Sequence, residues 1–244
     1  MQKDIKVEPT GIWRFKKKEE GGSEGLERQE KIKREKEEPK IVSRETKAER
    51  KDEEQRERAG VEEEFDRDYF ESGTKSNYKG YPDPNILKML QGKADLIEKF
   101  FPSNRAVLLE VGCAKGFLVK MLREKGFKVF GIDISGYAIQ NAEESIKSFV
   151  QIADIRERLP FKDNEFNGVL SVDVLEHIEE EKIGLVLKEL KRVGQKQLHF
   201  VTFGEGLDPN DKDKTHKTMK PQEWWGKKFL EADIAKENFS VPSL

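Results

Sequence analysis

The chain has 244 residues, of which 39% are charged, yet its formal net charge is only −2. Because opposite charges are interspersed, no strong net field attracts nucleic acid or an anionic membrane, and we expect neither as a partner. A single cysteine, Cys113, excludes an internal disulfide bond and any zinc site built from several cysteines. No apolar run approaches the roughly 20 residues of a membrane span, and the start of the chain lacks the apolar stretch of a signal peptide. We therefore expect a soluble, cytoplasmic protein.

Residues 1–64 differ in composition from the rest of the chain. More than half of them are charged, and apolar residues such as Ile32, Ile41 and Val42 are scattered without a heptad repeat. Such a segment cannot bury a core of its own, so we predict a disordered or loosely helical extension rather than a coiled coil. An arm that binds a partner is the alternative. The folded domain is predicted to span residues 65–244.

The predicted domain starts with an aromatic stretch and continues as alternating strands and helices. Tyr69, Phe70, Tyr78 and Tyr81 stand among glycines and prolines, and helical spacing follows over residues 86–97. Strands are predicted at 106–111, 127–132, 149–153, 166–172, 198–203 and 239–241, and helices at 117–125, 135–147 and 183–193. This alternation predicts a doubly wound, mostly parallel, Rossmann-like α/β sheet with helices on both faces. Ligands of such sheets bind beyond the carboxyl ends of the strands.

The sharpest local pattern is VLLEVGCAKGFLV, in which a strand ends in Glu110, Gly112 begins a turn and Gly116 opens the next helix. Glycine there allows both the turn dihedrals and the close approach of a ligand to the backbone. Asp133, at the end of the second strand, is placed to accept hydrogen bonds from both ribose hydroxyls of a nucleoside. The glycine spacing is neither G-x-G-x-x-G nor that of a P-loop, so a cofactor without phosphate fits better than a dinucleotide.

These residues carry a resemblance to a known family. VLLEVGCAKG resembles the first motif of class I S-adenosylmethionine-dependent methyltransferases, and LPFKDNEFNGVLSVDVLEHI resembles the fourth-strand region of their branch that methylates small molecules and lipids. The family often has glycine at the position of Ala114. The resemblance implies S-adenosylmethionine as cofactor and the following cofactor-binding set. Glu110, Gly112 and Gly116 would line the methionine and ribose, with Cys113 in the same turn; Asp133 with neighbouring Ile134 would bind the ribose; Asp154 and Ile155 would border the adenine; and Asp173 would lie near the amino and methyl groups.

Three histidines are the remaining candidates for chemistry. His216, in a polar segment after the fifth strand, is the candidate general base, with a surface histidine as the alternative interpretation. His177 is interpreted as a structural or supporting residue, and His199 as a packed, hydrogen-bonded core residue. Their wide spacing matches no zinc pattern, so no metal is expected.

The sequence therefore predicts methyl transfer from S-adenosylmethionine to a small molecule. Tyr69, Tyr78 and Tyr81 resemble the aromatic N-terminal lid of some methyltransferases that act on polar small molecules. Two alternatives stay open: a methyltransferase that acts on RNA or protein, and a methyltransferase-like module that binds without catalysis. The sequence does not define the oligomeric state.

Overall fold

The computed structural model describes residues 5–7, 13–15, 60, 63–101, 105–234 and 239–240. The chain divides into two compact units, Met1–Glu57 and Arg58–Leu244. In the first unit, β1 (Ile5–Val7) pairs with β2 (Trp13–Phe15) in antiparallel register. This short hairpin was not predicted. The other residues of the expected disordered or helical extension, up to residue 59, lie outside the described residues.

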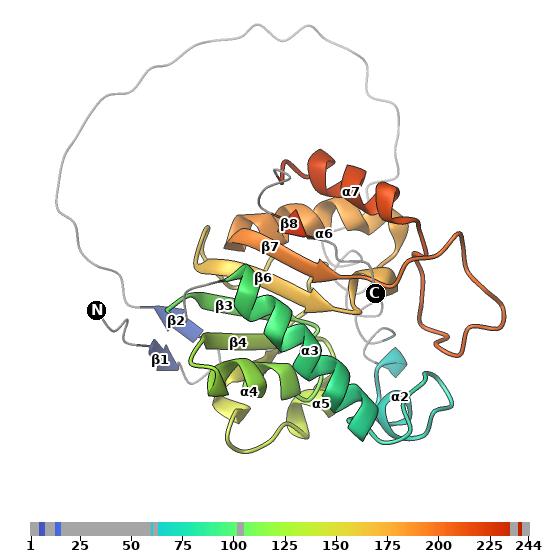
Figure 1. Cartoon of the computed structure of the whole chain (residues 1–244), viewed down its shortest axis with the longest axis horizontal. Coiled ribbons are helices and arrows are strands. Elements are labelled where there is room, and N and C mark those ends of the chain that lie inside the picture. The colour runs from blue at the N-terminus through green and yellow to red at the C-terminus, as the bar shows by residue number, and fades with distance from the viewer. Residues whose placement is uncertain are drawn as a thin grey trace, which may run out of the picture. The chain divides into compact units, whose positions relative to one another are not determined.

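The second unit is built on one parallel sheet (Figure 1). Its strands are β3 (Val107–Val111), β4 (Lys128–Asp133), β5 (Val150–Ile152), β6 (Phe166–Val172), β7 (Gly194–Phe200) and β8 (Phe239–Ser240). The spatial order is β5-β4-β3-β6-β7-β8, and every neighbouring pair is parallel. The winding direction therefore reverses between β3 and β6, and the predicted Rossmann-like fold is confirmed.

Helices connect the strands and cover the sheet. They are α2 (Arg67–Glu71), α3 (Pro84–Phe100), α4 (Phe117–Glu124), α5 (Gly136–Gln140), α6 (Glu180–Val193) and α7 (Gln222–Glu231), with short 3₁₀ turns η1 (Lys147–Phe149) and η2 (Leu175–His177). Figure 1 shows α3 crossing in front of the strands, and α2 and the long loop after β7 at the end toward which the arrowheads point. None of the helices in the described part of the chain has the length and apolar character that a membrane span requires.

Most predicted elements agree with the structure to within three residues at each end, and two differ by more. The helix predicted over 135–147 begins as expected, with Ser135 Oγ accepting from the amide of Ala138, but ends at Gln140. There Asn141, a weak helix former, turns its side-chain amide back to the carbonyl of Tyr137. The strand predicted over 198–203 covers residues 194–200 instead. Its polar first half carries no apolar signal, although Gln197 is buried through hydrogen bonds to the carbonyls of Leu190 and Gly194.

Candidate functional site

The turn between β3 and α4 is shaped by left-handed backbone. Gly112 has φ +68°, and a Cβ there would lie 2.3 Å from Cγ2 of Val174. Gly116 has φ +77°, and its Cβ would lie 2.5 Å from Cδ1 of Ile146. Ala114 also has a positive φ, 47°, which explains why the resembled family often has glycine at this position. Positions 112 and 116 of this turn therefore leave no room for a side chain.

Asp133 fixes the turn from the end of β4. Its Oδ2 accepts from the Ala114 amide at 2.7 Å, and its Oδ1 accepts from the Ser135 amide at 2.8 Å. Burial raises the pKa of Asp133, and these backbone hydrogen bonds oppose the shift. A carboxylate offers about four lone-pair sites, so acceptor capacity remains for hydroxyl groups of a ligand.

Three predicted cofactor residues do not line the pocket: Glu110 in β3, and Cys113 and Gly116 in the turn itself. Glu110 is buried, its Oε2 has no hydrogen-bond partner among the described residues, and burial beside Asp133 raises its pKa to about 8. Cys113 is also buried, and a Cβ on Gly131 would lie 2.7 Å from its Sγ. Burial raises the pKa of this thiol, so it is not a poised nucleophile.

The other predicted cofactor residues line one pocket at the carboxyl ends of the strands. Its volume is about 800 Å³ with the open mouth included. The predicted residues on its surface are Gly112, Asp133, Ile134, Asp154, Ile155 and Asp173. The fold thus brings together residues from four separate loops.

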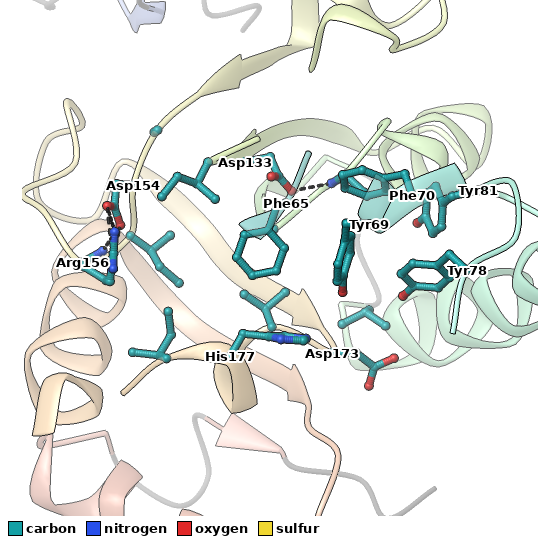
Figure 2. A pocket seen from close by; sticks show the side chains of 18 residues that line it. Phe65, Tyr69, Phe70, Tyr78, Tyr81, Asp133, Asp154, Arg156, Asp173 and His177 are labelled. Atoms are coloured by element: carbon teal, nitrogen blue, oxygen red, sulfur yellow. Dashed lines mark hydrogen bonds and ion pairs between the residues drawn. The ribbon is translucent and has the colours of Figure 1, made fainter. Parts of the chain in front are cut away.

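Five aromatic side chains, which we call the aromatic wall, cover this pocket: Phe65, Tyr69, Phe70, Tyr78 and Tyr81. Figure 2 shows the ring of Phe65 between Asp133 and His177. The Phe65 ring centre lies 5.0 Å from that of Tyr69 and 5.6 Å from that of His177, both edge to face. Sequence reasoning singled out the tyrosines but gave Phe65 no role.

Two side chains attach the segment that carries the aromatic wall to the rest of the site: Ser135 at the start of α5, and Lys115 in the turn between β3 and α4, which we call the cofactor turn. Ser135 Oγ donates to the carbonyl of Phe65 at 2.5 Å. Lys115, buried in the turn itself, binds the carboxylate of Glu71 and donates to the carbonyl of Tyr81 at 2.8 Å. The segment before the sheet is therefore part of the site.

Arg156 was missed by the sequence analysis. Its guanidinium binds both carboxylate oxygens of Asp154, with Nη2 to Oδ2 at 2.7 Å, and both side chains are almost fully buried. A bidentate pair of this kind fixes the carboxylate orientation. Asp154 therefore borders the pocket as half of an ion pair (Figure 2).

On the other side of the pocket, Asp173 is followed by the turn η2. Glu176 is fully buried, and its Oε1 accepts from the Thr202 amide at 3.0 Å. Burial, together with the negative charge of Asp173, raises the pKa of Glu176 to about 8. His177 lines the pocket, and burial lowers its pKa to about 4.

The structure places the other two histidines differently. His199 is fully buried and bonded to Ser171 Oγ at 2.7 Å, as predicted for a core residue. His216, the candidate general base, does not line the pocket. Its side chain is only 11% exposed, its Nδ1 lies 2.6 Å from Asp211 Oδ2, and its ring centre lies 4.8 Å from that of His177. His216 is therefore no surface histidine, and its ring packs against the histidine that lines the pocket.

Comparison with known proteins finds similarity to methyltransferases. Residues 109–201 match the family model described as a methyltransferase domain. An uncharacterised protein of Methanocaldococcus jannaschii is 31% identical over 45% of this chain and 49% of its own length. The malonyl-[acyl-carrier protein] O-methyltransferase of Erwinia pyrifoliae is 30% identical over 46% of this chain and 42% of its own length. A solved methyltransferase structure from Archaeoglobus fulgidus has a TM-score of 0.49, with 19% identity over 60% of this chain and 68% of that one. The chain spans less than two thirds of the length of the curated relatives that it matches.

Proposed function

Because the chain carries a class I S-adenosylmethionine-dependent methyltransferase domain, we propose that it moves the methyl group of S-adenosylmethionine to a small molecule and releases S-adenosylhomocysteine. The acceptor atom is an oxygen, nitrogen or carbon. One observation carries the proposal. Three acids at the carboxyl ends of parallel strands, Asp133 of β4, Asp154 after β5 and Asp173 after β6, meet in one pocket beside a turn whose glycines leave no room for a side chain.

Within this proposal, each pocket residue contacts a different part of the cofactor. Asp133 accepts hydrogen bonds from the ribose hydroxyls, because its remaining lone pairs are the acceptors nearest the turn. Asp154 and Ile155 border the adenine, and Asp173 faces the amino and methyl groups. Cys113 and Gly116 shape the turn itself, and Glu110 supports it from β3. Gly112 lines the pocket without a side chain, which suits a cofactor that approaches the backbone closely.

The aromatic wall supports a small acceptor. Its rings cover the pocket between Asp133 and Asp173, and Lys115 and Ser135 hold the segment that carries them in place. A large, folded acceptor would have to insert a single group past these rings. Aromatic surfaces suit a compact organic molecule with an apolar part.

Methyl transfer from a sulfonium is an in-line displacement that depends on alignment and exclusion of water. The aromatic wall provides the exclusion, and the pocket walls provide the alignment. Removal of a proton from the acceptor by a side chain can add to the rate, but methyl transfer does not require it. His177 is the histidine that lines the pocket, and His216 packs behind it.

Calorimetry on the purified full chain tests the cofactor half of the proposal. We expect S-adenosylmethionine and S-adenosylhomocysteine to bind and NAD not to bind, and binding of NAD alone would overturn the assignment. Incubation with methyl-labelled S-adenosylmethionine and separated small-molecule, RNA and protein fractions then tests the acceptor. Label in the small-molecule fraction supports the proposal, whereas label only in RNA or protein favours a macromolecular acceptor. S-adenosylhomocysteine binding without labelling of any fraction favours a binding module.

A further inference from the structure

Glu176, His177 and His216 converge beside the pocket from two distant parts of the sequence. Glu176 and His177 are consecutive residues of η2, and His216 belongs to the loop after β7. Potential ligand atoms of these three side chains lie within 4.8 Å of one another. We propose that they bind a first-row divalent transition metal ion, such as Zn²⁺ or Mn²⁺.

Glu176 supplies an acceptor that nothing else in the described structure uses. The side chain is fully buried, and its Oε1 is satisfied by the Thr202 amide. Its Oε2 is buried without a hydrogen-bond partner among the described residues. A buried carboxylate oxygen without a donor needs an explanation, and an unseen ion is one of the recognised ones.

The hydrogen bonds of His177 leave a lone pair on the opposite ring nitrogen. Thr215 Oγ1 donates to Asp213 Oδ1 at 2.6 Å, so its single proton is committed. The same oxygen lies 2.8 Å from Nδ1 of His177 and must accept the proton that this nitrogen carries. Nε2 of His177 is then the unprotonated nitrogen, the form that ligates metals.

His216 is oriented in the same way by a carboxylate. Its Nδ1 lies 2.6 Å from Asp211 Oδ2 and donates to it, because an ionised carboxylate only accepts. Nε2 has no hydrogen-bond partner among the described residues, and in the neutral ring it carries the lone pair. A carboxylate behind a histidine is the usual support of a metal-binding imidazole, since it fixes the tautomer and raises the basicity of the ligand.

The ligand set selects the type of metal. Two imidazoles and one carboxylate occur in catalytic zinc sites and in non-haem iron sites, which keep positions open for water or substrate. Mg²⁺ prefers a shell of oxygen ligands and would bind more weakly here. Bonds of about 2.0–2.2 Å place two ligands at most about 4.4 Å apart. The cluster therefore needs only a small contraction around the ion.

The position of the cluster suggests how the metal is used. His177 lines the pocket together with Asp173. A coordination position of the metal ion that no protein ligand fills would therefore face the part of the pocket beside Asp173. There the ion would hold an oxygen atom of the acceptor, such as a hydroxyl, against the methyl donor. This use rests on the proposed function, whereas metal binding itself does not.

Metal binding is measured directly on the full chain after chelator treatment, by calorimetric titration with Zn²⁺, Mn²⁺ and Mg²⁺. We expect one Zn²⁺ or Mn²⁺ per chain and weaker binding of Mg²⁺. His216→Ala and Glu176→Gln should each weaken binding by about tenfold or more, and Asp211→Asn by about ten- to a hundredfold, the usual effect of removing a supporting carboxylate. Glu205→Gln, an exposed change in the same loop, is the control and should bind like the parent.

Circular dichroism establishes whether each variant is folded. If the buried change Glu176→Gln prevents folding, the two loop variants, His216→Ala and Asp211→Asn, still test the proposal. Absence of Zn²⁺ and Mn²⁺ binding, or equal binding by folded His216→Ala and the parent, overturns the proposal. S-adenosylhomocysteine binding is measured on the same samples. If the parent chain binds metal but not S-adenosylhomocysteine, the metal site is supported and the proposed function is refuted. If it binds S-adenosylhomocysteine but no metal, only the metal site is refuted.

Discussion

The two sides of the pocket are built by different means. The side at the ends of β3, β4 and β5, which we call the cofactor side, is shaped by backbone: left-handed turn residues and main-chain amides bound to Asp133. The side at the ends of β6 and β7, which we call the acceptor side, is formed by side chains. Those that line the pocket come from two segments far apart in sequence, around residues 65–81 and 172–178, and a third segment, residues 211–218, packs against them from behind.

This difference predicts which properties each side controls. A change to the backbone turn moves atoms that both hold the fold together and contact the ligand, so stability and cofactor binding should change together. A change to an acceptor-side side chain removes one group and leaves the turn in place. Substitutions on the acceptor side should therefore change metal binding, acid sensitivity or acceptor choice while cofactor binding is retained.

The largest effect is expected for Gly112→Ala. The new Cβ would combine a left-handed backbone with an overlap at 2.3 Å from Val174 Cγ2. Strain and overpacking together should lower the free energy of unfolding by about 2–4 kcal/mol. Urea unfolding and calorimetry with S-adenosylhomocysteine should show loss of stability and of binding together.

Gly184→Ala is the matched control for this change. Gly184 lies in α6 and has nothing within 4 Å of its ideal Cβ. The control should be more stable than the parent by roughly 0.5–1 kcal/mol, because alanine is the better helix residue. If Gly112→Ala has the same free energy of unfolding as the parent, the turn accepts a Cβ at position 112. The backbone of the turn would then not determine the shape of the cofactor side.

Asp133→Ala should weaken S-adenosylhomocysteine binding by about 1.5–3 kcal/mol, the range for hydrogen bonds to a charged group. Because Asp133 also holds the amides of Ala114 and Ser135, thermal unfolding should show a loss of stability as well. Asp163→Ala removes an exposed carboxylate paired with Arg192, far from the pocket lining, and should bind the ligand like the parent. Unchanged affinity in folded Asp133→Ala would refute the ribose assignment.

His199, beneath the acceptor side, should contribute to acid sensitivity beside His177, whose pKa is also lowered by burial. Burial lowers the pKa of His199 to about 3, below the unfolded value of about 6.5. The unfolded state takes up the proton first, so the stability contributed by neutral His199 is complete above pH 6.5 and is lost as pH falls toward 3. At pH 5 the loss should be about 2 kcal/mol. Urea unfolding of parent and His199→Gln at pH 7 and pH 5 should show a smaller pH effect in the variant; equal effects would exclude His199 as a contributor.

The smallest effect is expected from removal of residues 1–57. The second unit contains the sheet, the aromatic wall and both sides of the pocket. The truncated chain should therefore unfold cooperatively and bind S-adenosylhomocysteine like the full chain. Loss of cooperative unfolding would show that the first unit contributes to the folded domain after all.

Much of the cofactor side could be predicted from the sequence because its determinants are local. Glu110, Gly112 and Gly116 lie within seven residues, and their spacing reports the turn directly. Asp133 follows the next strand, and parallel strands bring their carboxyl ends to one edge. The bounds of β6, Phe166–Val172, agree with the predicted strand for a related reason, since most residues of this mainly buried strand are apolar.

The acceptor side could not be predicted because its contacts are long-range. Nothing in the spacing of His177 and His216 indicates that their rings lie 4.8 Å apart, since that depends on the path of the loop after β7. On the cofactor side, the ion pair of Asp154 with Arg156 could not be predicted either: it is local, but a charged residue two positions away on a loop is usually solvated, so the pattern carried no signal. No pattern in the sequence assigns a role to Phe65, whereas in the folded protein its ring packs against His177.

The single thiol of the chain can report on motion of the cofactor turn. Cys113 is 3% exposed, and its Sγ packs against Gly131, so a thiol reagent reaches it only when the turn opens. The labelling rate under native conditions therefore measures the free energy of that local opening. A ligand that closes over Gly112 should slow labelling in proportion to its occupancy, whereas one confined to the acceptor side should leave the rate unchanged. The natural sequence thus contains its own probe for timing the opening of one half of the pocket independently of the other.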